Sequence, residues 1–211
     1  MEPDEYVKSL VETVEGLSVA GVRSAADRLA AAWDRGSTVF VAGNGGSAAT
    51  ASHMACDLAK TAARGRPRGL RVVPLLDVSV LTAWANDVSY EAVFAAPLAA
   101  QARPGDVLIV ISASGDSPNI VEALTCARAA SVETIALLGF DGGAARALAD
   151  HVILANAAHY GVVEDVHLAV NHMLTELLRD RADAGAQRAA RPTADLSPAA
   201  APVCVRPVWE V

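Results

Sequence analysis

Apolar runs that alternate with stretches of helical periodicity constrain the fold of this chain more than any other feature. Five such runs occupy residues 38–41, 70–76, 106–111, 134–138 and 151–154. Helical stretches follow them at residues 47–60, 78–84, 90–102, 118–130, 144–148 and 162–184. Buried strands that alternate with helices are typical of a parallel sheet with helices on both faces. We therefore expect an α/β fold whose ligands bind at the carboxyl ends of the strands.

The two ends of the chain differ from this alternating region. Residues 3–34 carry apolar side chains at spacings of mostly three and four, which predicts one long helix or two helices before the first strand. A helical segment of that length must cover more than one sheet face or pack on another subunit. From residue 185 the composition shifts to Ala, Pro, Arg and Thr. The predicted organisation is a single domain over residues 1–184 and a disordered tail at 185–211.

The composition excludes several classes of function. A formal net charge of −7 argues against nucleic acid as the main ligand, because phosphate backbones are bound by clustered Lys and Arg. Three cysteines without a CxxC pair exclude a disulfide framework and a cysteine-only zinc site. No apolar run reaches the length of about 18 residues that indicates a membrane span. The first residues are acidic, unlike a signal peptide, so we expect a cytoplasmic protein.

The first apolar run ends in a glycine-rich turn, Gly43-Asn44-Gly45-Gly46-Ser47, that leads into an alanine-rich helix. Exposed backbone N–H groups at a helix N-terminus form a site for anions. The turn matches neither the GxGxxG dinucleotide fingerprint nor a P-loop, since no Lys-Ser or Lys-Thr follows. A tight strand–helix turn without a ligand would also explain these glycines. We favour phosphate binding because a second turn has the same chemistry.

The second turn follows the third apolar run and contains Ser112, Ser114 and Ser117 around a glycine. Ser117 can cap the next helix, and Pro118 suits the first turn of that helix because its missing N–H has no partner there. Three hydroxyl groups beside a positive helix end are more than capping requires. Asp116 is an unfavourable neighbour for a phosphate, so we expect it to point away or to contact sugar hydroxyls. Together the two turns predict a site for a phosphorylated small molecule.

Histidines and carboxylates form the third set of candidate residues. His53 and Asp57 lie at i and i+4 of one predicted helix and therefore share a face. Glu164 and His172 are eight residues apart on another predicted helix, about 12 Å along its axis. A core histidine and a surface aspartate would also explain the first pair. If all four side chains bind one metal ion, either the helix begins late or the ligands come from different subunits, and we favour a shared interface site.

These motifs resemble the sugar isomerase (SIS) domain and, within it, the phosphoheptose isomerase group. The resemblance covers about residues 29–178 and also includes Ala85-Asn86-Asp87, Asp141-Gly142-Gly143 and Glu164-Asp165-Val166-His167. It implies a three-layer SIS sandwich with a five-stranded parallel sheet, and a homotetramer with active sites at subunit interfaces. It also implies the conversion of sedoheptulose 7-phosphate to D-glycero-D-manno-heptose 7-phosphate through an enediol, assisted by zinc or another divalent metal.

Carried over position by position, the resemblance implies three roles. Acid–base catalysis would belong to Asp57, Glu164 and His172. The metal ion would bind His53, Asp57, Glu164 and His172. The sugar phosphate would contact Asn44, Gly45, Gly46, Ser47, Asn86, Asp87, Ser112, Ser114 and Ser117.

Several positions depart from the family pattern. Asp57 replaces the usual glutamate, Thr61 an arginine, Ala113 a hydroxyl residue, Gly161 an aspartate and Glu164 a glutamine. The shorter acid at position 57 moves the carboxylate by roughly 1–1.5 Å, and a misplacement of about 1 Å can cost about 10²-fold in rate. A second carboxylate, at position 164, can complete a ligand set of two histidines and two acids. Two alternatives stay open: an isomerase for another ketose phosphate, such as an eight-carbon sugar, and a tetrameric SIS scaffold without activity.

Overall fold

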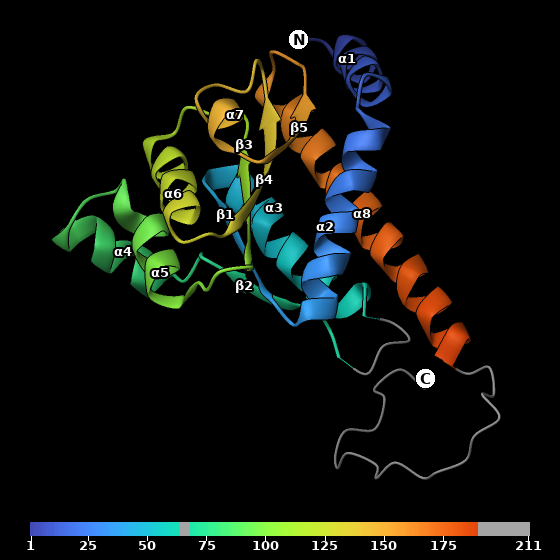
Figure 1. Cartoon of the computed structure of the whole chain (residues 1–211). Helices are drawn as coiled ribbons and strands as arrows, with labels where there is room; N and C mark the ends of the chain where they lie inside the picture. Colours follow the sequence, from blue (N-terminus) through green and yellow to red (C-terminus); the bar gives the residue numbers. More distant parts are fainter. Residues whose placement is uncertain (64–67, 190–211) are drawn as a thin grey trace.

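A five-stranded parallel sheet with the strand order β2-β1-β3-β4-β5 forms the centre of the computed structural model, which describes residues 1–63 and 68–189 (Figure 1). The strands are β1 (Thr38–Gly43), β2 (Arg71–Pro74), β3 (Val107–Ser112), β4 (Glu133–Gly139) and β5 (His151–Ala155). In the register of the sheet, Val39 of β1 lies between Val72 of β2 and Val107 of β3. The predicted parallel α/β sheet is therefore confirmed.

Helices cover both faces of the sheet. The layer that packs with one face contains α2 (Val19–Arg35), α3 (Gly45–Cys56) with its π-helical extension η1 (Asp57–Thr61), and α8 (Tyr160–Ala189). The opposite layer contains α5 (Ala92–Gln101), α6 (Pro118–Ala129) and α7 (Ala145–Leu148). The remaining two helices are α1 (Pro3–Glu15), which packs on α8, and α4 (Val78–Asp87), which packs on α5. The result is the expected three-layer sandwich.

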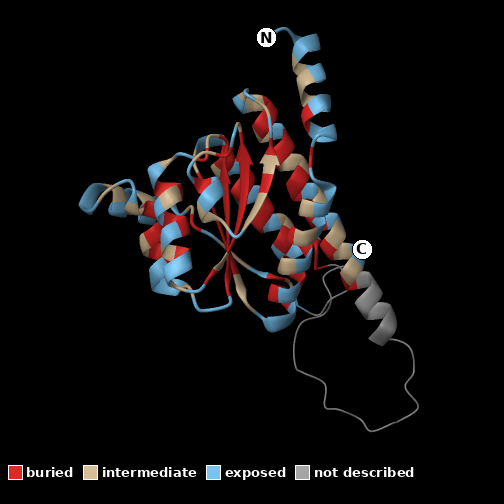
Figure 2. Ribbon diagram, turned by 45° about the horizontal axis from the view of Figure 1, so that its top comes forward, coloured by how far each residue is buried: buried red, intermediate tan, exposed pale blue. Residues whose placement is uncertain are grey.

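The strands are buried on both faces, as their continuous apolar runs require. Alternate residues of β3 point to opposite layers: Ile109 and Ile111 join the core under α2, α3 and α8, whereas Leu108 and Val110 join the core under α5 and α6. Figure 2 shows the sheet as the most continuously buried part of the molecule. This rigid centre fixes the positions of the loops at the strand ends.

The strand order reverses between β1 and β3, because the chain leaves β1 for β2 on one side and returns to β3 on the other. In an open parallel sheet, the loops at such a reversal diverge and leave a crevice at the carboxyl ends of the strands. The two predicted anion turns follow β1 and β3 directly. The topology thus brings together two turns that are about 70 residues apart in the sequence.

At the N-terminus the structure has two helices, one of the two predicted alternatives, and the hydroxyl of Ser18 caps the second by accepting a hydrogen bond from the Gly21 N–H. The C-terminal boundary differs from the prediction. Helix α8 continues to Ala189, beyond the predicted end at residue 184, because Ala, Gln and Arg favour helix. The rest of the predicted tail, residues 190–211, lies outside the described residues. No helix within residues 1–63 and 68–189 is long and apolar enough to cross a membrane.

Candidate active site

The glycine-rich turn brings the N-terminus of α3 against the end of β1. A Cβ atom on Gly43 would lie 2.7 Å from the carbonyl oxygen of Ser47, so only glycine permits this close approach. Asn44 occupies the N-cap position of α3, but its side chain does not cap the helix. Instead its amide forms two reciprocal hydrogen bonds of 2.9 Å with the amide of Asn119, a buried residue in the first turn of α6. This pair ties the two anion turns to each other.

The second turn is organised by its own hydroxyl groups. Ser112 Oγ accepts a hydrogen bond of 3.1 Å from the backbone N–H three residues on, and Ser114 Oγ accepts one of 3.3 Å from the N–H two residues on. Ser117 occupies the N-cap position of α6 but makes no side-chain capping bond, contrary to expectation, so its hydroxyl is not used in the cap. Asp116 Oδ1 accepts a hydrogen bond of 2.8 Å from the Ala144 N–H, which joins this turn to the loop after β4.

A crevice of about 150 Å³ separates the two turns. Its lining consists of Asn44, Ser47, Ile111, Ser112, Ala113, Ser114, Ser117, Tyr160 and Glu164. The N-termini of α3 and α6 both border it, and helix N-termini favour negative charge. These helix ends and the serine hydroxyls give the crevice the chemistry of an anion site. The carboxylate of Glu164 lies over the N-terminus of α3, since a Cβ atom on Gly46 would be 2.6 Å from Glu164 Oε2, and it opposes a second anion at that end.

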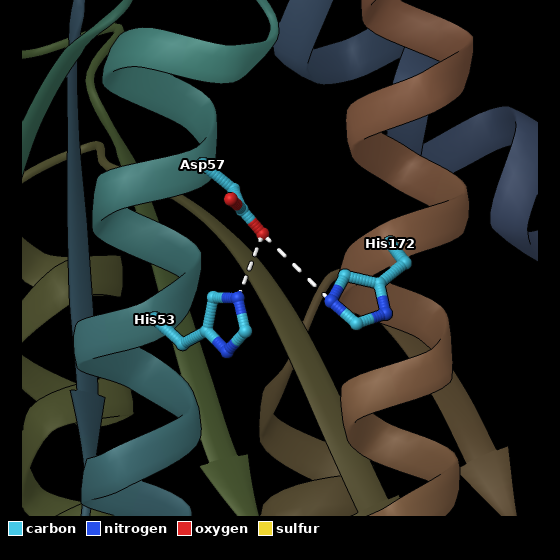
Figure 3. Close-up of side chains that lie close together, drawn as sticks. All are labelled: His53, Asp57 and His172. Atoms are coloured by element: carbon cyan, nitrogen blue, oxygen red, sulfur yellow. Dashed lines mark ion pairs between the residues drawn. The ribbon is translucent and has the colours of Figure 1, made fainter.

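A second cluster lies farther along α3 and α8 (Figure 3). His53 Nε2 of α3 lies 3.2 Å from Asp57 Oδ2, and His172 Nε2 of α8 lies 4.0 Å from the same oxygen. One potential ligand atom from each side chain lies within 4.8 Å of the other two. Figure 3 shows both imidazole rings beside the carboxylate, which comes from the start of η1. The cluster could bind one divalent cation.

Two residues that the sequence analysis did not assign to the site hold the carboxylate of Asp57. Asn171 Nδ2 donates a hydrogen bond of 2.8 Å to Asp57 Oδ2, and Thr61 Oγ1 donates one of 3.2 Å to Asp57 Oδ1. Thr61 lies at i+4 from Asp57, so helical spacing could have identified it. No sequence signal marks Asn171 beyond its position next to His172. The π-helical turn at 57–61, a feature often found at functional sites, was also not foreseen.

The predicted four-residue metal set does not form within one chain. Glu164 and His172 belong to one continuous helix, so they are about 12 Å apart along its axis. Among the described residues, the group with ligand atoms close enough for one ion contains His53, Asp57 and His172 but not Glu164. These three donors come from a single chain, and a site shared between subunits stays a prediction. Glu164 lines the anion crevice instead.

The segment predicted to contact substrate at the end of α4 lies at the edge of this region. Asn86 Nδ2 donates a hydrogen bond of 2.8 Å to Asp87 Oδ1; both residues are exposed and do not line the crevice. Tyr90, a few residues on, does reach the glycine-rich turn, because its hydroxyl donates a hydrogen bond of 3.1 Å to Asn44 Oδ1. In this structure Tyr90, rather than Asn86 or Asp87, connects this segment to the crevice.

Comparison with known proteins shows to which family this chain belongs. The sequence matches the SIS domain family over residues 4–139. It is 39% identical over 171 residues to the phosphoheptose isomerase of Trichlorobacter lovleyi, covering 81% of this chain and 87% of that protein. The chain belongs to the SIS domain family. Within this family it groups with the phosphoheptose isomerases, as predicted.

Further comparisons agree with this SIS assignment. The phosphoheptose isomerase of Chlorobaculum parvum is 37% identical over 176 residues, covering 82% of this chain and 84% of that protein. The solved phosphoheptose isomerase of Neisseria gonorrhoeae superposes with a TM-score of 0.77 at 30% identity, covering 84% of this chain and 94% of that one. The predicted SIS fold is confirmed.

One departure from the SIS pattern has a structural explanation in the packing of α1. A Cβ atom on Gly161 would lie 3.1 Å from Tyr6 Oη, and that hydroxyl donates a hydrogen bond of 2.6 Å to Asp165 Oδ2. The hydrogen bond to Asp165, together with desolvation, raises the pKa of Tyr6 to about 12. The small residue at 161 thus leaves room for the contact that docks α1 on α8.

Proposed function

We propose that this SIS-domain protein converts sedoheptulose 7-phosphate to D-glycero-D-manno-heptose 7-phosphate. Its curated relatives are named phosphoheptose isomerases, which makes an aldose–ketose isomerase the expected enzyme class. The observation that carries the proposal is that α3 and α8 both border the anion crevice near their N-terminal ends and both contribute a histidine to the His53–Asp57–His172 cluster farther along. Such an arrangement can bind a phosphate and present the other end of the same molecule to acid–base groups.

The spacing along α3 suits an open-chain sugar phosphate. Ser47 lines the crevice, and His53 follows six residues later, which is about 9 Å along a helix. A seven-carbon chain with its phosphate ester spans on the order of 10 Å when extended, at single-bond lengths of about 1.5 Å. With the phosphate between the two turns, C1 and C2 of the sugar would therefore lie beside the cluster.

The isomerisation moves a proton between C1 and C2 through an enediol, which requires a base and an acid at the same place. We assign the base to Asp57, since its carboxylate lies between two imidazole rings and is held on both oxygens. His172 is placed to give a proton to a sugar oxygen. Glu164 lies in the crevice, so within one chain the geometry supports Asp57 over Glu164 as the base.

The cluster also fits a divalent metal ion, in accordance with the predicted zinc. Two imidazoles and one carboxylate are the ligand set of a catalytic zinc site, which keeps a further position open for substrate. His53, Asp57 and His172 would hold the ion. Bound there, it would act as a Lewis acid that stabilises negative charge on a sugar oxygen.

Exposed apolar surfaces on two peripheral helices support a homotetramer. Helix α4 has no buried residue, and it exposes Val78, Val80 and Trp84. Helix α1 exposes Val7 and Val11 one turn apart, and it projects from the body of the molecule (Figure 2). Apolar patches of this kind mark association surfaces. Subunit interfaces that border the active sites, and a cytoplasmic location, stay predictions.

The proposal is tested by incubating the purified protein with sedoheptulose 7-phosphate, with and without added zinc, and measuring the aldose formed. Asp57→Ala and His172→Ala are expected to abolish turnover while the elution volume in size-exclusion chromatography is unchanged. Glu176→Gln is the matched control, because Glu176 is an exposed carboxylate one turn beyond His172 on α8 and pairs with Arg179.

Retained turnover in both alanine variants would refute the assignment of Asp57 and His172. Turnover of a six- or eight-carbon ketose phosphate in preference to the seven-carbon one would keep the mechanism and change the substrate. A protein that binds no metal and turns over none of these sugars would support the alternative of a SIS scaffold.

A further inference from the structure

Asn171 is a buried amide in a place where an apolar side chain would be expected. It lies in α8 with no exposed surface, between the apolar core residues Val170 and Leu174 of the same helix. Its Oδ1 atom has no hydrogen-bond partner among the residues that the structure describes. A buried polar atom without a partner destabilises a protein, whereas an apolar residue of similar shape would not. Packing alone therefore does not explain an asparagine here.

The other end of the amide makes one contact, to the carboxylate of Asp57. Asn171 Nδ2 donates a hydrogen bond of 2.8 Å to Oδ2, the oxygen that also lies 3.2 Å from His53 Nε2 and 4.0 Å from His172 Nε2. Of these three contacts of Oδ2, the one with Asn171 is the shortest. It crosses from α8 to η1 and so connects the helices that carry the two histidines. The amide thereby fixes both the position and the rotation of the carboxylate.

Thr61 completes the arrangement from the opposite side of the carboxylate. Its hydroxyl donates a hydrogen bond of 3.2 Å to Asp57 Oδ1, so each carboxylate oxygen receives one hydrogen bond from a neutral donor. Two donors on two different oxygens stop the carboxylate from rotating about its Cβ–Cγ bond. One lone-pair site of Oδ2 then remains, and the Nε2 atoms of His53 and His172 lie 3.2 and 4.0 Å from that oxygen.

We propose that Asn171 is a positioning residue, which holds the Asp57 carboxylate at the distance from His53 and His172 that acid–base chemistry at this site requires. The expected effect on activity rests on the proposed function, whereas the expected position of the Asp57 carboxylate does not. Groups that orient a reacting or ligating side chain typically contribute about 10- to 100-fold to activity or metal affinity. A short acid depends on such a partner because its side chain reaches less far from the helix.

The test compares Asn171→Leu with the wild type. The variant removes the amide and retains the branched skeleton of the side chain, so we expect kcat for the ketose phosphate to fall by about 10- to 100-fold, while KM changes by less than about threefold. Thr175→Val is the matched control, since Thr175 is a buried polar residue one turn on in α8 whose hydroxyl donates to the Asn171 carbonyl but does not contact Asp57. An unchanged kcat in Asn171→Leu, or an equal loss in Thr175→Val, would overturn the proposal.

A crystal structure of Asn171→Leu separates this proposal from the proposed function. We expect the Asp57 carboxylate to rotate away from His53; a carboxylate that keeps its place would overturn the proposal even if the wild type turns over no sugar. An inactive wild type with a displaced carboxylate in the variant would contradict only the proposed function. If Asn171→Leu does not fold, Asn171→Ser, which shortens the side chain without adding apolar volume, is measured in the same two ways.

Discussion

The stability of this protein should depend on pH through a buried histidine outside the active site. His167 lies in α8 against the sheet with 1% of its surface exposed. Neither ring nitrogen has a hydrogen-bond partner of good geometry among the described residues. Desolvation by burial lowers the pKa of His167 from 6.5 to about 4, and the nearby Leu138 backbone opposes this by less. The ring is therefore neutral in the folded protein at pH values where it is charged in the unfolded chain.

The sign and size of the effect follow from proton linkage. Because the folded pKa is below the unfolded one, the unfolded chain binds the extra proton, and the contribution of His167 to stability is fully present above about pH 6.5. It is lost as the pH falls toward 4. The difference between 6.5 and about 4, at about 1.4 kcal/mol per pH unit, corresponds to about 3 kcal/mol. This is a large share of a typical unfolding free energy of about 5–15 kcal/mol.

The assay is urea unfolding at several pH values between 7.5 and 4 for the wild type and for His167→Leu. Other groups titrate in this range too, so the informative quantity is the difference between the two proteins. We expect the unfolding free energy of the wild type to fall by about 3 kcal/mol more than that of His167→Leu. Thr175→Val, at another buried polar position of α8, should retain the wild-type pH dependence. Equal pH dependence in the wild type and His167→Leu would refute the reasoning.

Two further predictions concern the anion crevice. Gly46→Ala places a methyl group against the carboxylate of Glu164 and displaces that carboxylate within the crevice. We therefore expect KM for the sugar phosphate to rise about fivefold, or about 1 kcal/mol, with kcat retained. An unchanged KM would contradict the placement of the phosphate. Asn119→Ala removes the amide pair that ties the two turns together, so the unfolding free energy in urea should fall by about 1–3 kcal/mol and KM should rise. Unchanged values of both quantities would show that the turns are held by the sheet alone.

The sheet could be predicted from the sequence because its signals are local and redundant. Each strand is an apolar run with β-branched residues, and the first four runs lead into turns that contain glycine, serine or aspartate. The alternation with helices then leaves little freedom in topology. Ligands of open parallel sheets bind at the carboxyl ends of the strands, which places the turns after β1 and β3 at one crevice without any knowledge of side-chain contacts. The resemblance to the SIS domain implies the same parallel sheet.

The details of the candidate site depend on contacts between distant segments, and these the sequence did not specify. Helical spacing placed His53 beside Asp57, but nothing local indicates that Asn171 reaches the same carboxylate from 114 positions away. Glu164 is a similar case. Its charge and its position in the family pattern indicate a metal ligand, but α8 is one continuous helix, and Glu164 near its start lines the anion crevice. The π-helical turn after Cys56 has no sequence signature that we recognise.

Two of the departures from the family pattern, at positions 57 and 61, are in contact, and this changes how the short acid at position 57 should be judged. Considered alone, Asp57 looks like a weakened glutamate whose carboxylate falls short by roughly 1–1.5 Å, a misplacement that can be costly. In the folded chain, however, Thr61 replaces an arginine and donates to one oxygen of that carboxylate, while Asn171 donates to the other. The aspartate, the threonine and the asparagine therefore form one hydrogen-bonded unit, in which a donor on the same helical segment and a donor on α8 together fix the orientation of the short acid.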